Sequence, residues 1–466
     1  MAQVYLIGIG GSGMSAIARI LIERGYSVSG SDLELSSFTR ELQDLGAKVN
    51  IGHRPEQVFG AEEVVRSSAV PETNVEVQAA LSAGIPIYKR SEYIAKLIGN
   101  RTGVAVAGTH GKTTTTAMIS WVLTALKQDP SYIIGGVSRN LNNNAHAGTG
   151  PVFVIEADEY DYMFLGLRPN IAVITNIEHD HPDCFPTAED FFQAFVDFAH
   201  QIPPNGILIV CADDDGCLRL SEMSREFDCQ ILTYGFVDNE KQVSPDYFCT
   251  DVSMNQQGEY HFSYFFDRDI LGRVSLSVPG IHNVSNALAT LAVAHQLGIP
   301  VEQTGHVLGD YLGTRRRFEL RAEVAGIAII DDYAHHPTEI RMTLGAARNR
   351  YPGRQLWAVW QPHTYSRTKS LFEDYLTAFQ QADHVLVTEV FASREPVNTN
   401  FSSRQLVLSM DHPDVHFIAN NGEVAEYLVN HLHAGDVLLV LSAGDAYQIS
   451  EKVVDLLSVN GNKNYG

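Results

Sequence analysis

Residues 108–115 read GTHGKTTT and lie between two segments of different character. The apolar run 104–107 before them predicts a buried strand, and residues 116–126 after them predict a helix. In a loop of this kind backbone N–H groups surround a phosphate, a lysine reaches the outer phosphate oxygens and a threonine binds Mg²⁺. The longer common form has a further glycine where this chain has Val106, so the loop is a shortened version. It predicts an α/β protein whose parallel sheet presents a nucleotide-phosphate site.

The alternation of predicted strands and helices continues on both sides of this loop and is interrupted twice. Polar stretches at 99–103 and 313–317 separate three segments, so we predict domains at residues 1–98, 99–313 and 314–466. From about residue 230 to residue 278 short alternating runs predict antiparallel hairpins added to the middle domain. A chain of 466 residues can supply each of these α/β domains with its own core.

Composition restricts the classes of function. The chain has 33 Lys and Arg against 55 Asp and Glu, and its net charge of −22 argues against broad contact with nucleic acid. No apolar run approaches the ~18 residues of a membrane-spanning helix, and the first residues lack the features of a signal peptide. Five cysteines without a CxxC pair indicate a reduced protein. We therefore expect a cytoplasmic protein without membrane insertion, and its oligomeric state stays open.

A second glycine-rich turn follows the strand predicted at residues 4–7. Gly8, Gly10 and Gly13 have the GxGxxG spacing, and Asp32 closes the next predicted strand 19 residues after Gly13. Glycines at these positions let the backbone approach a diphosphate, and the acid can bind a ribose hydroxyl, as in Rossmann-like domains. The residues themselves leave NAD as the default ligand and do not distinguish a dinucleotide from a sugar nucleotide.

Polar motifs also follow other predicted strands. Glu156, in the motif EADE, follows a strand at 152–155, and the motif NIEHDHPD at 176–183 follows a strand at 171–174. Because strand carboxyl ends share one edge of a parallel sheet, these groups are placed to bind the Mg²⁺ of the phosphate loop. A solvated loop is the alternative for 176–183, and a structural zinc site is disfavoured because no second Cys/His cluster has ligand spacing.

The third segment contains two motifs of the same kind. DDYAHHP at 331–337 follows a strand predicted at 327–330, and QPHTYSR at 361–367 follows one at 356–360. We expect both motifs to face one cleft from the side opposite the phosphate loop. His335 and His336 alone could equally cap a helix.

In combination these motifs resemble the Mur ligase family of peptidoglycan synthesis, from Val4 to about Asp445. In family order the motifs are GIGGSGMS, GTHGKTTT, EADE, NIEHDHPD, GIHNVSNALA, GTRRRFE, DDYAHHPTEI and QPHTYSRT. The resemblance implies an N-terminal Rossmann-like domain for UDP, a central P-loop ATPase domain, and a C-terminal Rossmann-like domain that closes over ATP and binds an amino acid. It also implies an ATP-dependent ligase that joins L-alanine to the lactoyl carboxylate of UDP-N-acetylmuramate through an acyl phosphate.

The resemblance further implies roles for individual residues, with Lys112, Arg317 and His335 as catalytic groups. The implied ATP-binding residues are Gly108, Thr109, His110, Gly111, Lys112, Thr113, Thr114, His282, Asn283, Asn286, Arg316, Arg317 and Asp332. Those implied for the UDP sugar are Gly8, Gly10, Gly11, Gly13, Ser31, Asp32 and Ser68. Those implied for the amino acid are Tyr333, His335, His363 and Arg367. Two Mg²⁺ ions, which Mn²⁺ could replace, would be held by Thr113, Glu156 and His181.

Several alternatives stay open. Many family members have Arg where this chain has Thr364, and Phe195 occupies the place of the carbamylated lysine of later-acting ligases, as in alanine-adding members. The form EADEYD also resembles the ligase that reattaches a recycled murein tripeptide. An NAD-dependent oxidoreductase and a nucleotide-dependent switch are the more distant readings. The amine could lose its proton to water or to His335, whose type of side chain has a pKa near neutrality.

Overall fold

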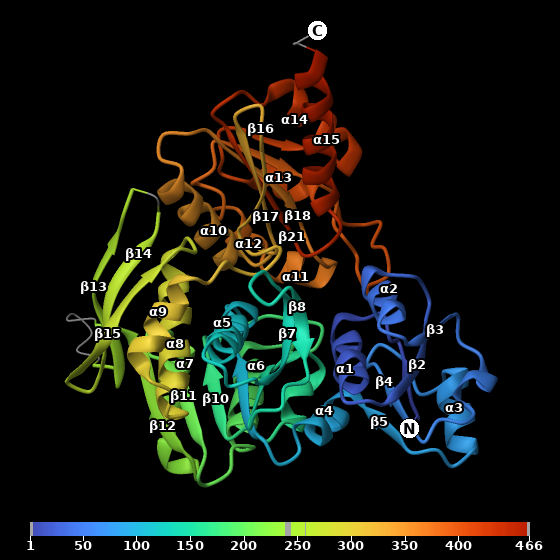
Figure 1. The fold of residues 1–466 in the computed structure, drawn as a ribbon. Coiled ribbons are helices and arrows are strands. Elements are labelled where there is room, and N and C mark those ends of the chain that lie inside the picture. The colour runs from blue at the N-terminus through green and yellow to red at the C-terminus, as the bar shows by residue number, and fades with distance from the viewer. Residues whose placement is uncertain (1–2, 238–243, 257, 464–466) are drawn as a thin grey trace.

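The computed structural model describes residues 3–237, 244–256 and 258–463, and these residues form three sheets, one after another along the chain. Figure 1 shows the blue N-terminal part and the cyan-to-yellow central part side by side, with the orange-to-red C-terminal part above them. The predicted α/β fold class with three domains is confirmed.

The N-terminal sheet is parallel throughout. Within residues 3–98 its strands lie in the order β3 (Lys48–Ile51), β2 (Ser27–Asp32), β1 (Gln3–Ile7), β4 (Glu63–Arg66) and β5 (Ile87–Lys89). The helices that cover it are α1 (Ser12–Glu23), α2 (Ser37–Asp44), α3 (Val75–Ser82) and α4 (Arg90–Ile98), with a 3₁₀ turn η1 (Pro55–Val58).

The central sheet is mixed. In the described part of the middle segment its strands lie in the order β15 (Asp269–Leu276), β14 (Tyr260–Phe266), β13 (Tyr247–Met254), β12 (Gln230–Phe236), β11 (Ile207–Cys211), β10 (Ile171–Ile174), β6 (Thr102–Ala107), β9 (Val152–Glu156), β7 (Ser131–Ser138) and β8 (Asn143–His146). Its helices and 3₁₀ turns are α5 (Lys112–Ala125), η2 (Tyr160–Gly166), α6 (Ala188–Ala199), α7 (Asp215–Glu222), η3 (Ser224–Glu226), α8 (Ile281–Gln296) and α9 (Val301–Gly309).

The antiparallel region predicted from residue 230 onward is only partly correct. β12 pairs in parallel with β11, and β13 pairs in parallel with β12, so antiparallel pairing begins between β13 and β14. The chain between β11 and β12 crosses over through α7, and such a crossover returns the next strand in the same direction. Alternating hydrophobicity reports that a strand has one exposed face, but it carries no information on strand direction.

The C-terminal sheet is parallel except at one edge, where β16 runs antiparallel to β17. Within residues 314–463 its strands lie in the order β16 (Glu319–Val324), β17 (Ile327–Asp332), β21 (Val437–Ser442), β18 (Leu356–Gln361), β19 (His384–Val387) and β20 (Val415–Phe417). Its helices are α10 (Pro337–Arg350), α11 (Tyr365–Ser370), α12 (Phe372–Tyr375), α13 (Arg404–Ser409), α14 (Asn421–His431) and α15 (Tyr447–Lys463).

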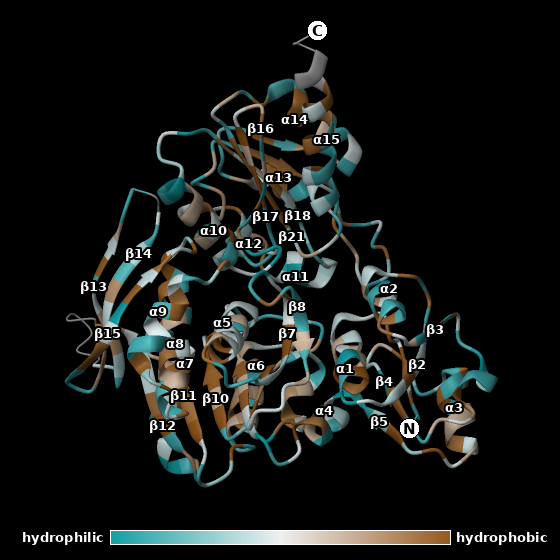
Figure 2. Cartoon of the chain, in the orientation of Figure 1, coloured by the Kyte–Doolittle hydropathy of each residue, from teal (hydrophilic) through white to brown (hydrophobic). Residues whose placement is uncertain are grey.

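Helices cover both faces of the parallel sheets, which explains the almost continuous apolar composition of the inner strands. All residues of β10, β17, β18 and β21 are buried, and Figure 2 shows mainly brown, hydrophobic strands, with helices of mixed teal and brown residues around them. The polar motifs therefore emerge where these strands end. Among the described residues no helix combines the length and the apolar composition needed to cross a bilayer.

Candidate active site

A cavity of about 880 Å³ is lined by residues of all three domains. Its walls include Ser12, Gly13 and Arg90 from the N-terminal domain, Lys112, Thr113, Glu156, Glu159, Asp180 and His181 from the central domain, and Arg317, Tyr333, His335, His363, Arg367 and Arg394 from the C-terminal domain. A neighbouring cavity of about 610 Å³ shares Gly111, Arg317 and Glu339 with it. The phosphate loop thus lies between two cavities, called below the three-domain cavity and the α8 cavity.

The phosphate loop passes directly from β6 into α5. Helix α5 begins at Lys112, four residues before the predicted start, because Gly111 has a left-handed φ of 80° and ends the loop there. Gly108 has a φ of 129°, and a Cβ atom at that position would lie 2.1 Å from Thr175 Oγ1, so a side chain does not fit. Lys112 Nζ donates to the Gly108 carbonyl at 2.5 Å and lies 2.8 Å from a Glu159 carboxylate oxygen.

The end of β9 brings carboxylates to this loop, as the sequence predicts. Thr113 Oγ1 donates to Glu156 Oε1 at 3.0 Å, and the Gly135 N–H donates to Glu156 Oε2 at 2.7 Å. Burial raises the pKa of Glu156, although nearby Lys112 partly offsets the effect. Glu159 ends the EADE motif, and the sequence alone does not assign it a role. Burial raises its pKa to about 7, against the lowering effect of Lys112.

His181, the third predicted metal ligand, lies beside these carboxylates. Its Nε2 atom is 3.6 Å from Glu159 Oε1, and its backbone has a left-handed φ of 54°. Burial lowers the pKa of His181 to about 4, so the imidazole is neutral and keeps a lone pair for a metal ion. The hydroxyl of Thr113, the carboxylate of Glu156 and this imidazole therefore face one cavity, as a site for a divalent cation requires.

His110 joins the phosphate loop to the C-terminal domain. Its Nε2 atom is 2.9 Å from Glu178 Oε2, and its Nδ1 atom is 3.2 Å from Glu339 Oε1 of α10. Burial lowers the pKa of His110, but the hydrogen bonds with Glu178 and Glu339 outweigh it and raise the pKa to about 9. Ligand atoms of His110, Glu178 and His336 lie within 4.8 Å of one another. A metal ion would have to displace the proton of His110 to bind it. The contacts of His110 with Glu178 and Glu339 form an ion-pair cluster between the central and C-terminal domains.

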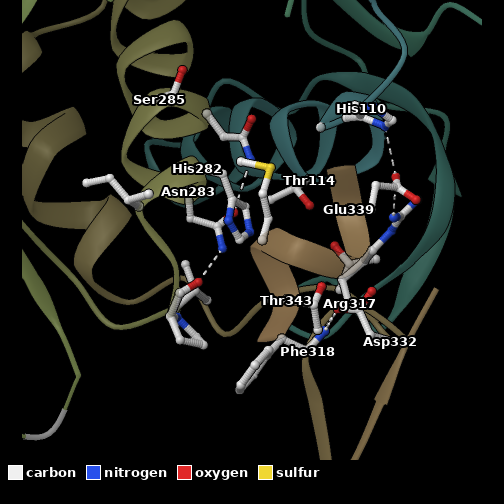
Figure 3. Close-up of a pocket in the computed structure, with 18 of the residues that line it drawn as sticks. His110, Thr114, His282, Asn283, Ser285, Arg317, Phe318, Asp332, Glu339 and Thr343 are labelled. Atoms are coloured by element: carbon white, nitrogen blue, oxygen red, sulfur yellow. Dashed lines mark hydrogen bonds and ion pairs between the residues drawn. The ribbon is translucent and has the colours of Figure 1, made fainter. Parts of the chain in front are cut away.

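The α8 cavity is lined by the start of α8 and by residues of the C-terminal domain. Asn283 Nδ2 donates to the Pro279 carbonyl at 2.7 Å, and Asn286 Nδ2 donates to Asn283 Oδ1 at 3.0 Å. Thr115 Oγ1 of α5 donates to Asn286 Oδ1 at 3.1 Å, which ties α8 to the phosphate loop. In Figure 3, His282, Asn283 and Thr114 lie on one side of the cavity, and Phe318, Thr343 and Asp332 lie on the other.

Asp332 and the two predicted arginines frame the C-terminal side of these cavities. Asp332 accepts hydrogen bonds from the Phe318 and Ala334 N–H groups, both at 2.7 Å, and burial raises its pKa to about 6. Arg317 lines both cavities, and its Nη1 atom lies 3.6 Å from Glu339 Oε1. Arg316 Nη2 instead donates to the Ser442 carbonyl at 2.6 Å. The guanidinium of Arg316 is thus anchored to the loop after β21.

Aromatic and imidazole rings form a row along the C-terminal wall of the three-domain cavity. Ring centroids are 5.7 Å apart for Tyr333 and His335, 5.9 Å for His335 and His363, and 5.9 Å for His363 and Phe391. His335 Nδ1 lies 3.0 Å from the Tyr333 carbonyl, which can only accept, so Nδ1 carries the proton and Nε2 the lone pair. Burial and the charge of Arg367 lower the pKa of His335 to about 3. The near-neutral pKa expected from its residue type is therefore wrong.

Arg367 forms a buried ion pair across two domains. Its Nε atom donates to Asp180 Oδ1 at 2.6 Å and its Nη2 atom to Asp180 Oδ2 at 3.0 Å, while Nη1 donates to His363 Nδ1 at 3.0 Å. Arg367 is 2% exposed and Asp180 is 4% exposed. Burial alone would raise the pKa of Asp180, but Arg367 holds it well below its usual range. The motif that contains Asp180 does not by itself identify Arg367 as its partner.

The N-terminal turn is organised by β2. The N–H groups of Gly8 and Ile9 donate to the Ser31 carbonyl at 2.8 and 3.0 Å, and the Gly10 N–H donates to Asp32 Oδ2 at 2.7 Å. The Ser31 hydroxyl points inward and donates to the buried carboxylate of Glu76 at 2.5 Å. Of the predicted UDP-sugar residues, Gly13 lines the three-domain cavity, while Gly11 lies within the turn and Ser68 in the turn after β4.

A phosphate loop that opens into a cavity shared by three α/β domains belongs to a nucleotide-dependent enzyme that brings several substrates together. The family models described as Mur ligase family, catalytic domain, Mur ligase middle domain, and Mur ligase, glutamate ligase domain match residues 3–102, 106–294 and 316–444. The chain belongs to the Mur ligase family, as its motifs predict.

Individual relatives cover nearly the whole chain. The chain is 39% identical over 456 residues to the UDP-N-acetylmuramate–L-alanine ligase of Caldanaerobacter subterraneus subsp. tengcongensis, with 97% of each chain covered. The crystal structure of UDP-N-acetylmuramate–alanine ligase from Thermotoga maritima is similar, with a TM-score of 0.82, 28% identity, and 99% and 100% of the two chains covered. The crystal structure of a murein peptide ligase from Psychrobacter arcticus is also similar, with a TM-score of 0.72 and 26% identity, and the match covers 98% of this chain and 99% of that one.

Proposed function

We propose that this chain is an ATP-dependent ligase that joins L-alanine to the lactoyl carboxylate of UDP-N-acetylmuramate, producing ADP and phosphate, in peptidoglycan synthesis. The observation that carries the proposal is the cavity lined by all three domains, because a three-substrate ligation has to assemble its reactants in one place. An NAD-dependent oxidoreductase needs neither the phosphate loop nor the C-terminal domain. The 39% identity to an alanine ligase over 97% of both chains, and the TM-score of 0.82 to an alanine-ligase structure against 0.72 to a murein peptide ligase, favour alanine over a recycled tripeptide.

The proposal assigns one substrate to each domain. Residues 1–98 bind the UDP sugar at the turn of Gly8 to Gly13, residues 99–313 bind ATP, and residues 314–466 bind the amino acid. The ends of the elements support these limits, since α4 ends at Ile98 and β6 begins at Thr102, while α9 ends at Gly309 and β16 begins at Glu319. The adenine occupies the α8 cavity beside His282 and Asn283, with Asp332 at the ribose. ATP is a cytoplasmic substrate, so the proposal places the reaction in the cytoplasm.

The first step is phosphoryl transfer. The lactoyl carboxylate oxygen attacks the γ-phosphorus in line, the bond to the bridging oxygen breaks, and ADP leaves behind an acyl phosphate. Lys112 at the start of α5 and Arg317, which lines both cavities, neutralise phosphate oxygens as negative charge shifts between them. The protein contributes mainly position and charge, which accounts for the number of cationic groups around the loop.

Thr113, Glu156 and His181 fit Mg²⁺. Glu156 receives hydrogen bonds only from neutral groups, Thr113 and the Gly135 N–H, among those described for it, and its burial raises its pKa. A buried carboxylate of this kind gains from a cation beside it. Two ions, which Mn²⁺ could replace, would supply charge neutralisation at the phosphate oxygens when bound.

The second step is amide formation. The amine of L-alanine attacks the carbonyl carbon of the acyl phosphate, and phosphate leaves with the electrons of the C–O bond. Tyr333, His335, His363 and Arg367 surround the amino acid, and the Nε2 lone pair of His335 orients the amine as a hydrogen-bond acceptor. Because its pKa is lowered to about 3, His335 is a weak proton acceptor, so the proposal gives the departing proton to water.

The test is ADP release in the presence of UDP-N-acetylmuramate and Mg²⁺. L-alanine is supplied in one reaction and the murein tripeptide L-Ala-γ-D-Glu-meso-diaminopimelate in another. Release that depends on alanine and not on tripeptide is the expected result. Release with the tripeptide alone assigns the chain to peptide recycling, and no release with either substrate contradicts the proposed ligase.

A further inference from the structure

We infer that Arg394 binds the carboxylate of the incoming amino acid, an assignment that rests on the proposed ligase function. An amino acid in this reaction must present its amine to the acyl phosphate while its carboxylate is held away from the negatively charged phosphates. A guanidinium in the cavity wall that has a free donor and is not assigned to the phosphates meets this requirement.

Arg367 is already committed to protein groups. All three of its guanidinium nitrogens donate to side chains, Nε and Nη2 to Asp180 and Nη1 to His363. The pair with Asp180 is buried and joins two domains, so giving it up for a substrate carboxylate would leave Asp180 without its cation. Arg367 therefore positions His363 and the two domains, and another cation has to bind the carboxylate.

Arg315 also lines the cavity, but it lies beside the phosphate loop: its N–H donates to the Val137 carbonyl at 2.9 Å, and a Cβ atom at Gly136 would lie 3.4 Å from Thr113 Cγ2 and 4.0 Å from the Arg315 carbonyl. The remaining arginines of the cavity are engaged with protein groups. Arg90 of the N-terminal domain contacts Asp158 at 3.3 Å, and Arg316 donates to the Ser442 and Gly444 carbonyls. Arg321 contacts Asp331 at 3.4 Å and Glu319 at 3.6 Å. Arg317 lies between the cavities beside Glu339, where the phosphates of ATP are proposed to bind.

Arg394 differs from these residues in its contacts. Its Nε and Nη2 atoms donate to the same oxygen of Asp183, at 3.1 and 2.7 Å, and among the described residues its Nη1 atom has no hydrogen-bond partner. Its guanidinium lies over the Tyr160 ring, 4.0 Å from the ring centroid, and this contact orients the guanidinium group. The Arg394 side chain is 38% exposed, so this ion pair is weak enough to be exchanged for a substrate carboxylate.

The backbone places Arg394 beside the row of rings. The Thr364 N–H donates to the Phe391 carbonyl at 3.0 Å, and the Phe391 N–H donates to the Pro362 carbonyl at 2.8 Å. Phe391 stacks on His363, and Arg394 follows three residues later, within the wall of the same cavity. An amine at His335 and a carboxylate at Arg394 would place the amino acid beside His363 of this row.

The alternative is that Arg394 serves only as an interdomain ion pair with Asp183. The two roles are separated by comparing L-alanine with L-alaninamide, which has the same amine and methyl group but no carboxylate. Alanine-dependent and alaninamide-dependent ADP release are measured for the wild type, Arg394→Gln, Arg394→Lys and Asp183→Asn. Arg219→Gln is the matched control, because Arg219 also pairs with a carboxylate, that of Glu189, and lies 3.8 Å from the Phe192 ring, but lines neither cavity.

For a carboxylate-binding role, Arg394→Gln raises the KM for L-alanine about 10- to 100-fold, the effect of losing a charged hydrogen bond. The KM values for ATP and UDP-N-acetylmuramate stay unchanged, alaninamide turnover is unaffected, and Arg394→Lys recovers part of the loss. Asp183→Asn and Arg219→Gln leave the KM for alanine at or below the wild-type value.

The inference is overturned if Arg394→Gln affects alanine and alaninamide equally, or if Asp183→Asn reproduces the Arg394→Gln effect. A wild-type enzyme that shows no alanine-dependent ADP release overturns the proposed function as well. Normal alanine turnover with no change in Arg394→Gln overturns the Arg394 assignment alone.

Discussion

Replacing Asp180 by Asn tests the buried ion pair between the central and C-terminal domains. The substitution keeps the side-chain volume but removes the negative partner of Arg367, which is 2% exposed and donates hydrogen bonds to the two Asp180 carboxylate oxygens at 2.6 and 3.0 Å. Breaking a buried pair by removing one partner costs about 3–5 kcal/mol, because the remaining charge stays buried. The pair of Asp183 and Arg394 at the same interface is half-exposed, and such pairs contribute about 0.2–1 kcal/mol.

Differential scanning calorimetry can measure the expected difference in stability between Asp180→Asn and Asp183→Asn. For a domain the size of the C-terminal one, 1 kcal/mol shifts the unfolding temperature by about 2–4 °C, so Asp180→Asn is expected to lower that of the C-terminal transition by about 6–20 °C. Asp183→Asn is the internal comparison and should shift it by a few degrees at most. The double variant Asp180→Asn/Arg367→Gln should be less destabilised than the sum of its single variants. Equal shifts for Asp180→Asn and Asp183→Asn would refute the reasoning.

Three further predictions concern the individual domains. Lys112→Ala is expected to lower the rate of ADP release at least about 100-fold while calorimetric binding of UDP-N-acetylmuramate is retained, and equal loss of both would contradict the assignment of Lys112 to ATP. His110 has a pKa raised from 6.5 to about 9, so its stabilising contribution is complete below pH 6.5 and is lost as the pH rises through 9. The unfolding temperature of the wild type should therefore fall more steeply between pH 7 and 9.5 than that of His110→Gln, and parallel profiles would count against the ion-pair cluster. UDP at about 100 times its Kd should stabilise the protein by about 2.7 kcal/mol in thermal unfolding, whereas NADH should have no effect. Protection by NADH would instead support a dinucleotide as the ligand of the N-terminal domain.

Local features of the site could be predicted from the sequence because they depend on neighbouring residues. The phosphate loop lies between β6 and α5 as expected, since glycines in a strand-to-helix turn determine the path of the backbone. Glu156 and His181 also follow β9 and β10, whose carboxyl ends share one edge of the sheet. The directions of β12 and β13 differ from the predicted antiparallel hairpins, because both strands pair in parallel with their preceding neighbour. Hydrophobic alternation does not encode the connection that sets the direction of a strand.

The sequence by itself therefore determined the fold class, the family, and the motifs that line the site. Only the tertiary structure decided what those side chains contact. Asp180 and Arg367 are 187 residues apart, and the pKa of His335 is lowered by burial and by the charge of Arg367. His110 becomes a cation because a carboxylate lies beside each of its two ring nitrogens, Glu178 from the central domain and Glu339 from the C-terminal domain. The physical reason is that backbone conformation follows from local sequence, whereas burial and electrostatic partners follow from the packing of distant elements, which no local motif contains.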